Sequence, residues 1–454
     1  MTYSREQGDI NASDARGRYW ERNLSPAARA VFEADHRYFL HQSLSTPVLN
    51  VLSRAEGIHI YDMDGKAYID MHGNGVHNAG FNNDAVIEAV VAALREKNTF
   101  APRRYTNAHA VALAKKLVEI TPEGLDRVLF APGGSEAIEM AVMLAKQVTG
   151  KWKTISFWDS YHGNGFQAAS VGGERLFKTG SGPMVPGALH VEFPNYYRNP
   201  WGFATEEQVD DEILRQMELL FEREGDIACV VGEPISSTPV VPSGRFWARV
   251  KAMCEKYGAL LIFDEIIEGF GRTGRMFACE HSVTPDVLVL GKSLGGGLLP
   301  FAGIVTREAY NTLPHVSIGH YTHEKNGLCA AAGLAMIAYV EKHGLVRQAE
   351  RVGAFALDWL EGMRARCPLV GHVGGKGLHI GIELVKDGDA KEKAVAEAEA
   401  VMYKAMERGV AFKIIEGNVI TLRPSLLITE DEMRGALEII EQCIREVAHG
   451  RGYE

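Results

Sequence analysis

Two polar residues follow apolar runs in the middle of the chain, where their side chains are placed to act on a shared ligand. Asp264 follows the apolar run 260–263, and Lys292 follows the run 287–291. Both runs are predicted strands of a parallel sheet, and ligands of such sheets bind at the carboxyl edge. We therefore expect a carboxylate and an amine to face one ligand from neighbouring strand ends.

A glycine-rich turn is the third feature suited to binding a ligand. The segment Pro132-Gly133-Gly134-Ser135-Glu136 follows the predicted strand 127–131 and opens a predicted helix at 137–147. The N-terminus of a helix presents unpaired backbone N–H groups and the positive end of the helix dipole, which bind phosphate. Ser135 adds a hydroxyl. Taken alone, the turn is equally typical of an ordinary helix cap.

One cofactor, pyridoxal 5′-phosphate (PLP), requires all three features together. It needs a lysine for a Schiff base, an acid beside its pyridine nitrogen and a site for its phosphate. Lys292, Asp264 and the turn at Gly134 and Ser135 supply these groups. The sequence therefore predicts a PLP-dependent enzyme.

Two other glycine-containing segments imitate nucleotide-binding motifs without completing them. The dinucleotide fingerprint that begins with Gly73-Asn74-Gly75 has Asn78 where a third glycine is required. Gly291-Lys292-Ser293 matches the end of a P-loop, but Asp286 stands where its first glycine belongs. Both classes of nucleotide-binding protein are therefore disfavoured.

Composition excludes further classes of protein. The 454 residues include 48 Lys and Arg against 58 Asp and Glu, a net charge of −10, which disfavours nucleic-acid and membrane partners. No apolar run approaches the ~20 residues of a membrane-spanning helix. Six dispersed cysteines indicate thiols rather than a disulfide framework, and His320 and His323 lack a third metal ligand. We expect a cytoplasmic enzyme without a metal.

Hydrophobic periodicity predicts an α/β protein in which helices cover a mostly parallel sheet. A hairpin is expected first, at 57–70. Amphipathic helices such as 209–223 and 246–257 separate several strands of the sheet. The predicted strands are 127–131, 154–158, 227–231, 260–263 and 287–290.

The chain is expected to have three parts. Residues 1–56 form an N-terminal segment, and 57–325 form the large cofactor-binding domain. Residues 326–454 are expected to form a smaller α+β domain, because charged helices alternate there with short strands at 378–383 and 419–422.

The chain resembles the class III aminotransferase family of PLP-dependent enzymes, which has fold type I. Its most specific stretch is 263–274, Phe-Asp-Glu-Ile-Ile-Glu-Gly-Phe-Gly-Arg-Thr-Gly, followed by Pro285-Asp286 and by 291–297, Gly-Lys-Ser-Leu-Gly-Gly-Gly. The resemblance extends from about residue 57 to residue 442. Further agreement comes from Gly134-Ser135-Glu136-Ala137, Tyr161-His162-Gly163, Glu233-Pro234 and Leu422-Arg423-Pro424.

The resemblance implies roles for individual residues. Lys292 forms the Schiff base with the cofactor and then transfers the substrate proton, while Asp264 keeps the pyridine nitrogen protonated. Gly134 and Ser135 bind the cofactor phosphate.

The resemblance also implies contacts around the cofactor ring and the substrate. Tyr161 and Ile266 hold the two faces of the ring, and Arg423 pairs with an anionic group of the substrate. Thr322 resembles the threonine that reaches the phosphate from the neighbouring subunit, which implies a homodimer with shared active sites. Glu233 either lies near the substrate or has a structural role.

Departures from the usual family pattern bear on the reaction. They fall at 72–80, 102–105, 236–237 and 323–327. The first of these segments contains His77, which we expect to contact substrate. Arg103 and Arg104 resemble an arginine-aromatic pair of phospho-lyase relatives, and either residue is expected to clamp a dianionic head group together with Arg423.

These departures predict an ammonia-lyase that acts on a small anionic amine. The resemblance to lyase members of the family implies deaminating elimination of 1-hydroxy-2-aminoethylphosphonate to phosphonoacetaldehyde and ammonia. The alternative is an ω-aminotransferase that transfers the amino group to a 2-oxo acid such as pyruvate. Racemase or epimerase chemistry is a further alternative, because each reaction begins with loss of a proton beside the amine nitrogen.

Overall fold

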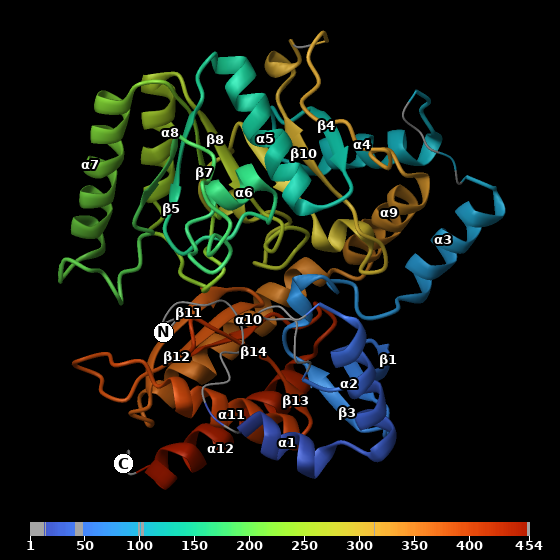
Figure 1. Ribbon diagram of the computed structural model, residues 1–454, viewed down its shortest axis with the longest axis vertical. Coiled ribbons are helices and arrows are strands. Elements are labelled where there is room, and N and C mark those ends of the chain that lie inside the picture. Colours follow the sequence, from blue (N-terminus) through green and yellow to red (C-terminus); the bar gives the residue numbers. More distant parts are fainter. Residues whose placement is uncertain are drawn as a thin grey trace. The chain divides into compact units, whose positions relative to one another are not determined.

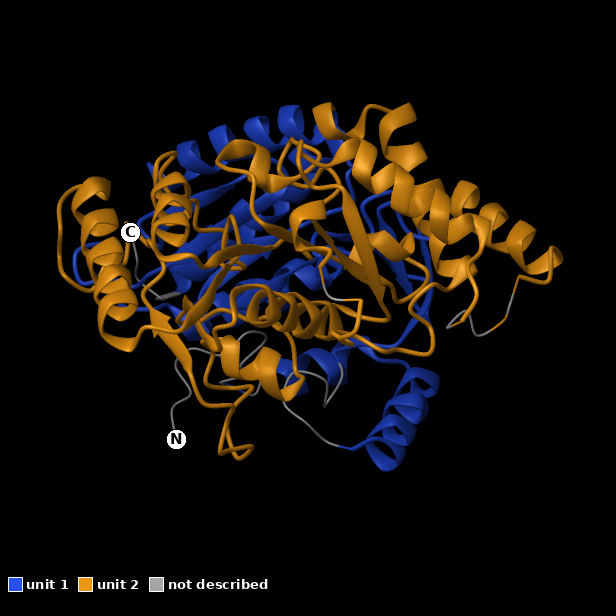
Figure 2. Cartoon of the chain, turned by 90° about the horizontal axis from the view of Figure 1, so that it is seen from above, with its two compact units in different colours: residues 1–83, 348–454 blue, residues 84–347 orange. Residues whose placement is uncertain are grey.

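The computed structural model of the protein describes residue 13 and residues 15–40, 49–98, 100, 104–312 and 314–451. They form two compact units, which have different colours in Figure 2. We call residues up to Asn83 together with those from Gln348 onward the composite unit. Residues from Asp84 to Arg347 are the central unit.

The central unit is built on a seven-stranded sheet (Figure 1). One strand, β10, pairs antiparallel with both β4 and β9, whereas the pairs from β9 to β6 are parallel. The predicted mostly parallel sheet is thereby confirmed. In sheet order the strands are β4 (Arg127–Ala131), β10 (Ala302–Thr306), β9 (Val287–Leu290), β8 (Leu260–Asp264), β7 (Ile227–Gly232), β5 (Lys153–Phe157) and β6 (Ala188–Val191).

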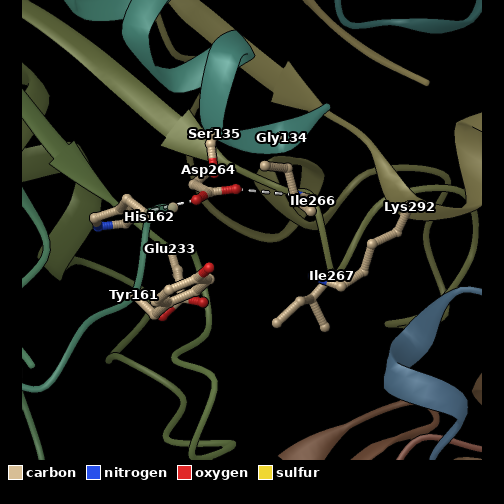
Figure 3. A pocket seen from close by; sticks show the side chains of 10 residues that line it. Gly134, Ser135, Tyr161, His162, Glu233, Asp264, Ile266, Ile267 and Lys292 are labelled. Carbon is tan, nitrogen blue, oxygen red and sulfur yellow. Dashed lines mark hydrogen bonds and ion pairs between the residues drawn. The ribbon is translucent and has the colours of Figure 1, made fainter. Parts of the chain in front are cut away.

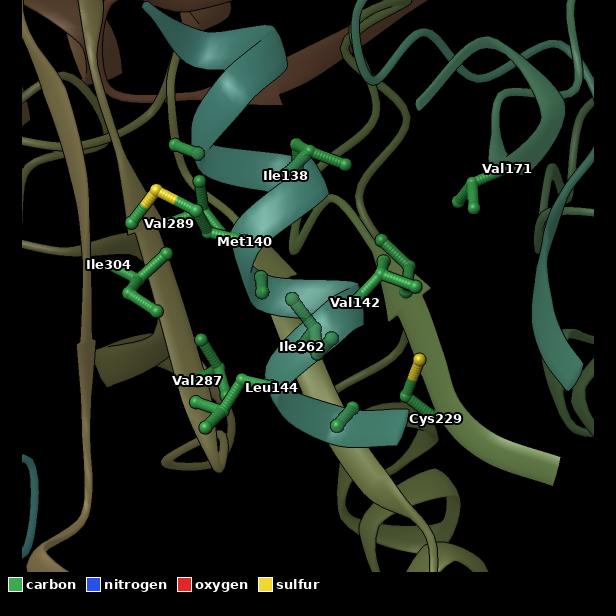
Figure 4. Close-up of a cluster of buried hydrophobic side chains, with 14 of the residues drawn as sticks. Ile138, Met140, Val142, Leu144, Val171, Cys229, Ile262, Val287, Val289 and Ile304 are labelled. Carbon is green, nitrogen blue, oxygen red and sulfur yellow. The ribbon is translucent and has the colours of Figure 1, made fainter. Parts of the chain in front are cut away.

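Helices bury the central strands of this sheet. The strands β7, β8 and β9 are buried along their whole lengths. Figure 4 shows Met140 and Leu144 of α5 beside Val287 and Val289 of β9. Full burial of an apolar side chain of this size contributes about 1.5–3 kcal/mol relative to exposure. The packed core therefore fixes where each strand ends.

Several helices surround the sheet. The helix α8 has the predicted bounds, while α7 begins three residues before the predicted 209–223, because Thr205 and Gln208 form a capping box. The helices of the central unit are α3 (Asp84–Arg95), α4 (Ala108–Ile120), α5 (Gly134–Thr149), α6 (Phe166–Val171), α7 (Glu206–Glu224), α8 (Phe246–Tyr257) and α9 (Gly327–Lys342).

The composite unit contains two four-stranded sheets. The predicted hairpin at 57–70 is confirmed as the antiparallel pair β2 and β3. The first sheet is β1 (Leu52–Glu56), β2 (His59–Asp62), β3 (Ala67–Asp70) and β13 (Val410–Ala411). The second is β11 (Val370–Lys376), β12 (His379–Leu384), β15 (Val419–Leu422) and β14 (Lys413–Ile415). The helices are α1 (Ala15–Asn23), α2 (Pro26–Tyr38), α10 (Leu345–Arg364, which begins in the central unit), α11 (Val395–Glu407) and α12 (Glu430–Arg451).

The unit borders differ from the predicted borders after residues 56 and 325. Residues 57–83 fold with the C-terminal part because β13 pairs in parallel with β3, with Val410 opposite Ile69. Helix α9 belongs to the central unit, where Gly333 allows close packing, since a Cβ there would lie 2.5 Å from the carbonyl oxygen of Leu294. Among the described helices, none has both the length and the apolarity of a membrane span.

Replacing Trp247 by alanine should lower the free energy of unfolding by about 3–5 kcal/mol, because the change leaves a large cavity. The indole is fully buried in α8, lies 4.8 Å from the ring of Phe263 and donates its N–H to the carbonyl of Pro234 at 3.0 Å. Urea unfolding measures the effect. Trp158→Ala is the control, because that side chain is 43% exposed, and an equal loss in both variants would contradict the prediction.

Candidate active site

The carboxylate of Asp264 lies at the end of β8 and is almost completely buried. Its Oδ2 lies 2.8 Å from Nδ1 of His162, and its Oδ1 accepts the backbone N–H of Ile266 at 3.1 Å. His162 is also buried, in the segment after β5. These contacts give each carboxylate oxygen a partner and orient the side chain where little water reaches it.

The pair formed by His162 and Asp264 is electrostatically coupled. Burial by itself lowers the pKa of His162, because the charged imidazolium is disfavoured away from water. The hydrogen bond to Asp264 and the charges of Asp264 and Glu233 act in the opposite direction and prevail, so the pKa of His162 is raised. Nδ1 of His162 is therefore protonated and donates a hydrogen bond to the carboxylate of Asp264.

Lys292 follows β9 and begins a short 3-10 turn, Lys292–Gly295. Its backbone has a φ of 45°, in the left-handed region, which costs about 1–3 kcal/mol for a residue other than glycine. The preceding Gly291 lies against Ile266, where an added Cβ would come within 3.3 Å of Cγ1. Surrounding core packing holds this strained conformation and thereby fixes the direction of the lysine side chain.

Lys292 and Asp264 line one pocket of the central unit, which Figure 3 shows in close-up. The lysine enters it from one side, and Asp264 lies across from it. The structure thus brings together the residues that the sequence placed at neighbouring strand ends. The pocket is lined by Gly134, Ser135, Tyr161, His162, Gly163, Glu233, Asp264, Ile266, Ile267 and Lys292.

The glycine-rich turn forms a cradle at the N-terminus of α5. Its cap residue is Gly133, which has no side chain to bond the first N–H groups of the helix. A Cβ on Gly134 would lie 2.7 Å from Cδ1 of Ile266, and one on Gly163 would lie 2.5 Å from Oγ of Ser135. Ser135 Oγ accepts the backbone N–H of Asn164 at 3.0 Å, which leaves its own hydroxyl proton to donate. This cradle has the donors that an anion requires.

An aromatic and an aliphatic side chain form the pocket walls. Tyr161 packs against Phe177 with 4.3 Å between ring centroids. Ile266 packs against Gly134 of the cradle and against Gly291, which follows β9. Burial, and then the charges of Asp264 and Glu174, raise the pKa of Tyr161, so its phenol stays neutral. Apolar walls with a few directed polar groups suit a flat heteroaromatic ligand.

Three pocket residues, His162, Gly163 and Ile267, have no role assigned from the sequence. His162 directly follows Tyr161, and its position just after a predicted strand was the available signal. Ile267 has no such signal, because an apolar residue is equally typical of the core. Glu233, left open between two roles by the sequence, also lines the pocket.

Arg423 follows β15 in the composite unit and is buried. Its Nε donates to Nδ1 of His379 at 3.1 Å, and its Nη1 lies 3.3 Å from Nε2 of His72. Two imidazole rings therefore orient the guanidinium, as a fixed anion-binding group requires.

The remaining predicted contacts lie outside the pocket lining. His77 is half-buried and its ring packs at a tilt against Phe81, with 3.9 Å between ring centroids. Arg104 and Thr322 are exposed. Arg103 lies outside the described residues. The substrate roles of His77, Arg103 and Arg104 and the phosphate contact of Thr322 stay predictions.

The chain matches the family model "Aminotransferase class-III" over residues 41–444. It belongs to the class III aminotransferases. It is 40% identical to (R)-1-hydroxy-2-aminoethylphosphonate ammonia-lyase of Vibrio splendidus, with 98% of this chain and 96% of the relative covered. A leucine/methionine racemase of Thermococcus litoralis is 32% identical, with 93% and 96% covered.

Solved transaminases have the same fold type I. An amine transaminase from an uncultivated Pseudomonas species, crystallised with PLP, matches with a TM-score of 0.86 and 29% identity, covering 90% of this chain and 99% of that one. The omega transaminase of Pseudomonas jessenii matches with a TM-score of 0.88 and 27% identity, covering 93% and 99%.

PLP is the cofactor of this class III enzyme. The pocket contains a chemical complement for each part of the molecule. An amine is present for the aldehyde, a buried carboxylate for the pyridine nitrogen and an N–H-rich cradle for the phosphate. The residues therefore fit the group.

Lys292→Ala should abolish the visible absorbance of the purified enzyme, because no amine remains in the pocket to bond the cofactor aldehyde. A visible spectrum of the variant after incubation with PLP measures the loss. Lys116→Ala is the matched control, because Lys116 pairs with Glu341 in an ion pair of 2.7 Å rather than lining the pocket. A retained band in Lys292→Ala would remove Lys292 from its role.

Asp264→Asn should keep cofactor binding but lower turnover by about 10²–10⁴-fold, since loss of one charge of a buried pair is worth about 3–5 kcal/mol. Asparagine keeps the shape of the side chain while removing the charge opposite the pyridine nitrogen. Cofactor content and turnover are measured on one preparation. A near-normal rate with full cofactor content would contradict the role.

Proposed function

We propose that this protein is an ammonia-lyase that converts 1-hydroxy-2-aminoethylphosphonate to phosphonoacetaldehyde and ammonia. The observation that carries the proposal is the 40% identity to the Vibrio splendidus lyase over 98% of the chain. The racemase is 32% identical, and a relative from Bacillus subtilis named "Probable 4-aminobutyrate aminotransferase" is 31% identical. A relative that is clearly more similar across its full length supports a shared substrate class.

In this proposal Lys292 removes a proton from the carbon that carries the amino group. The bound PLP supplies an electron sink for the pair of electrons left behind. Asp264, oriented by His162, keeps the pyridine nitrogen protonated and so favours that withdrawal. The C–O bond on the neighbouring carbon then breaks, and water hydrolyses the released enamine to the aldehyde and ammonia.

The glycine cradle and the pocket walls hold the cofactor in a fixed orientation. Backbone N–H groups at Gly134 and the hydroxyl of Ser135 bind the phosphate, while Tyr161 and Ile266 restrict rotation of the ring. Restricting the ring keeps the breaking C–H bond in one orientation toward Lys292, which is the main requirement for a selective proton transfer.

The substrate phosphonate requires cationic donors. Arg423 is the best supported, because His379 and His72 already fix its guanidinium, and a fixed fork pairs with two oxygens at little entropic cost. Arg104, Arg103 and His77 stay candidates for further contacts. A homodimer in which Thr322 contacts the phosphate of the partner's cofactor, and a cytoplasmic location, also stay predictions.

Transfer of the amino group to a 2-oxo acid is the second candidate function. The solved structures that match this chain with TM-scores of 0.86 and 0.88 are transaminases, so the fold itself accommodates that reaction. Both reactions use the same lysine and acid. They differ in whether the substrate carries a leaving group beside the reacting carbon.

Purified enzyme mixed with 1-hydroxy-2-aminoethylphosphonate, without a 2-oxo acid, should release ammonia over many turnovers while its visible absorbance returns to the starting spectrum. Taurine, 4-aminobutyrate and β-alanine lack the leaving hydroxyl and serve as comparison amines.

Ammonia assay and stopped-flow absorbance give the result, with Lys292→Ala as the background. An aminotransferase instead shows one lasting shift of the absorbance, reversed only when pyruvate or 2-oxoglutarate is added. That outcome would replace the proposed lyase by the second candidate.

A further inference from the structure

Three buried side chains that carry nitrogen donors, Arg423, His72 and His379, lie together in the composite unit. Arg423 follows β15 and His379 begins β12, and the antiparallel pairing of these two strands places them side by side. The backbone N–H of Arg423 donates to the carbonyl of Met71 at 2.5 Å, which brings the following residue, His72, to the same place. Backbone hydrogen bonds therefore assemble this cluster.

His379 holds one side of the guanidinium. Nε of Arg423 donates to Nδ1 of His379 at 3.1 Å. An arginine side chain has donors only, so an anion that binds to it is left the Nη groups. One of these, Nη1, lies 3.3 Å from Nε2 of His72.

A backbone turn decides which nitrogen of His72 carries the hydrogen of the ring. His72 caps the 3-10 turn Gly73–Gly75, and its Nδ1 accepts the backbone N–H of Asn74 at 3.1 Å. A neutral imidazole accepts at one nitrogen and donates at the other. Because the backbone N–H keeps its hydrogen, Nδ1 is the acceptor and Nε2 carries the hydrogen.

The same turn holds the ring of His72 in position. Gly73, Asn74 and Gly75 have φ values of 48°, 50° and 68°, in the left-handed region that glycine and asparagine tolerate best. A Cβ on Gly73 would lie 2.7 Å from Oδ2 of Asp70, whose Oδ1 accepts the backbone N–H of His72 at 3.2 Å. The direction of the Nε2–H bond is thereby set before any ligand arrives.

Nε2 of His72 and Nη1 of Arg423 are consequently both donors, so their 3.3 Å contact is not a hydrogen bond between them. Hydrogen bonds from such groups to an anionic oxygen are about 2.7–2.9 Å long. Two donors 3.3 Å apart can therefore both reach oxygens of one anionic head group. Burial strengthens these contacts, because little water competes for the donors.

Resting on the proposed lyase function, we infer that His72 is a specificity-determining residue whose Nε2–H donates to the substrate phosphonate that Arg423 binds. A phosphonate has three oxygens, so two pair with the Nη groups and the third accepts from His72. A carboxylate has only two oxygens, and the planar guanidinium fork occupies both. His72 therefore favours a phosphonate over a carboxylate head group.

Two variants of His72 separate the donor from the turn. His72→Asn keeps an acceptor near the position of Nδ1, but its shorter side chain does not reach the position of Nε2. His72→Gln places an amide N–H near the position of Nε2 and lacks the acceptor for the turn. The ligands are 2-aminoethylphosphonate, β-alanine and propylamine, which have chains of similar length and differ in the head group.

Affinity of the holoenzyme for each amine is measured from the change in visible absorbance immediately after mixing. His72→Asn should weaken binding of 2-aminoethylphosphonate about 10–100-fold, the range for a lost hydrogen bond to a charged group. Binding of β-alanine should weaken much less, and binding of propylamine should not change. His72→Gln should restore most of the phosphonate affinity. With 1-hydroxy-2-aminoethylphosphonate, His72→Asn should raise KM and keep kcat.

His372→Asn is the matched control and should leave the three affinities unchanged. His372 is a half-buried histidine of β11, in the same sheet as β12 and β15, and it lies opposite Glu383. Equal weakening of all three amines in His72→Asn would indicate a structural effect and overturn the inference. Unchanged phosphonate affinity in His72→Asn, or equal losses for the phosphonate and the carboxylate, would overturn it as well.

These titrations use amines without a leaving hydroxyl, so they do not depend on the lyase reaction. An unmodified enzyme that releases no ammonia from 1-hydroxy-2-aminoethylphosphonate would refute the proposed function. The selective loss of phosphonate binding in His72→Asn would still support the role of His72 in recognising the head group.

Discussion

The active site depends on one buried charge, the carboxylate of Asp264. An ionised carboxylate inside a protein costs several kcal/mol unless hydrogen bonds and an opposite charge offset the loss of water. Here a strand end directs it toward His162, and the backbone N–H of Ile266 occupies its other oxygen. Burial raises the pKa of Tyr161, and this charge raises it further; the same charge and its hydrogen bond raise the pKa of His162 against the effect of burial.

The pocket has separate positive and negative groups, and these match the charges of its cofactor. Helix α5 presents its positive end at Gly134 and Ser135, whereas Asp264 and Glu233 supply negative charge. PLP carries an anionic phosphate and a protonated pyridine nitrogen at different positions of one ring. These groups would hold a molecule with this distribution of charge in one orientation, and Lys292 lines the same pocket.

The machinery shared across the family does not select the reaction. Transaminases with TM-scores of 0.86 and 0.88 are superimposable on most of this chain, and a racemase is 32% identical to it. Loss of a proton next to nitrogen is common to these reactions. The fate of the electron pair left on carbon depends on which groups reach the neighbouring carbon.

Local sequence determined the strands, the glycine turn and the identities of Lys292 and Asp264, because alternating apolar runs and helix caps are set by nearby residues. It did not determine the unit borders, since β13 joins β3 across more than 300 residues of chain, a pairing without a local signal. It also could not show that His162 contacts Asp264 or that Glu268 is fully buried. Burial and long-range contacts decide charge states, so the protonation of the site is a property of the tertiary structure alone.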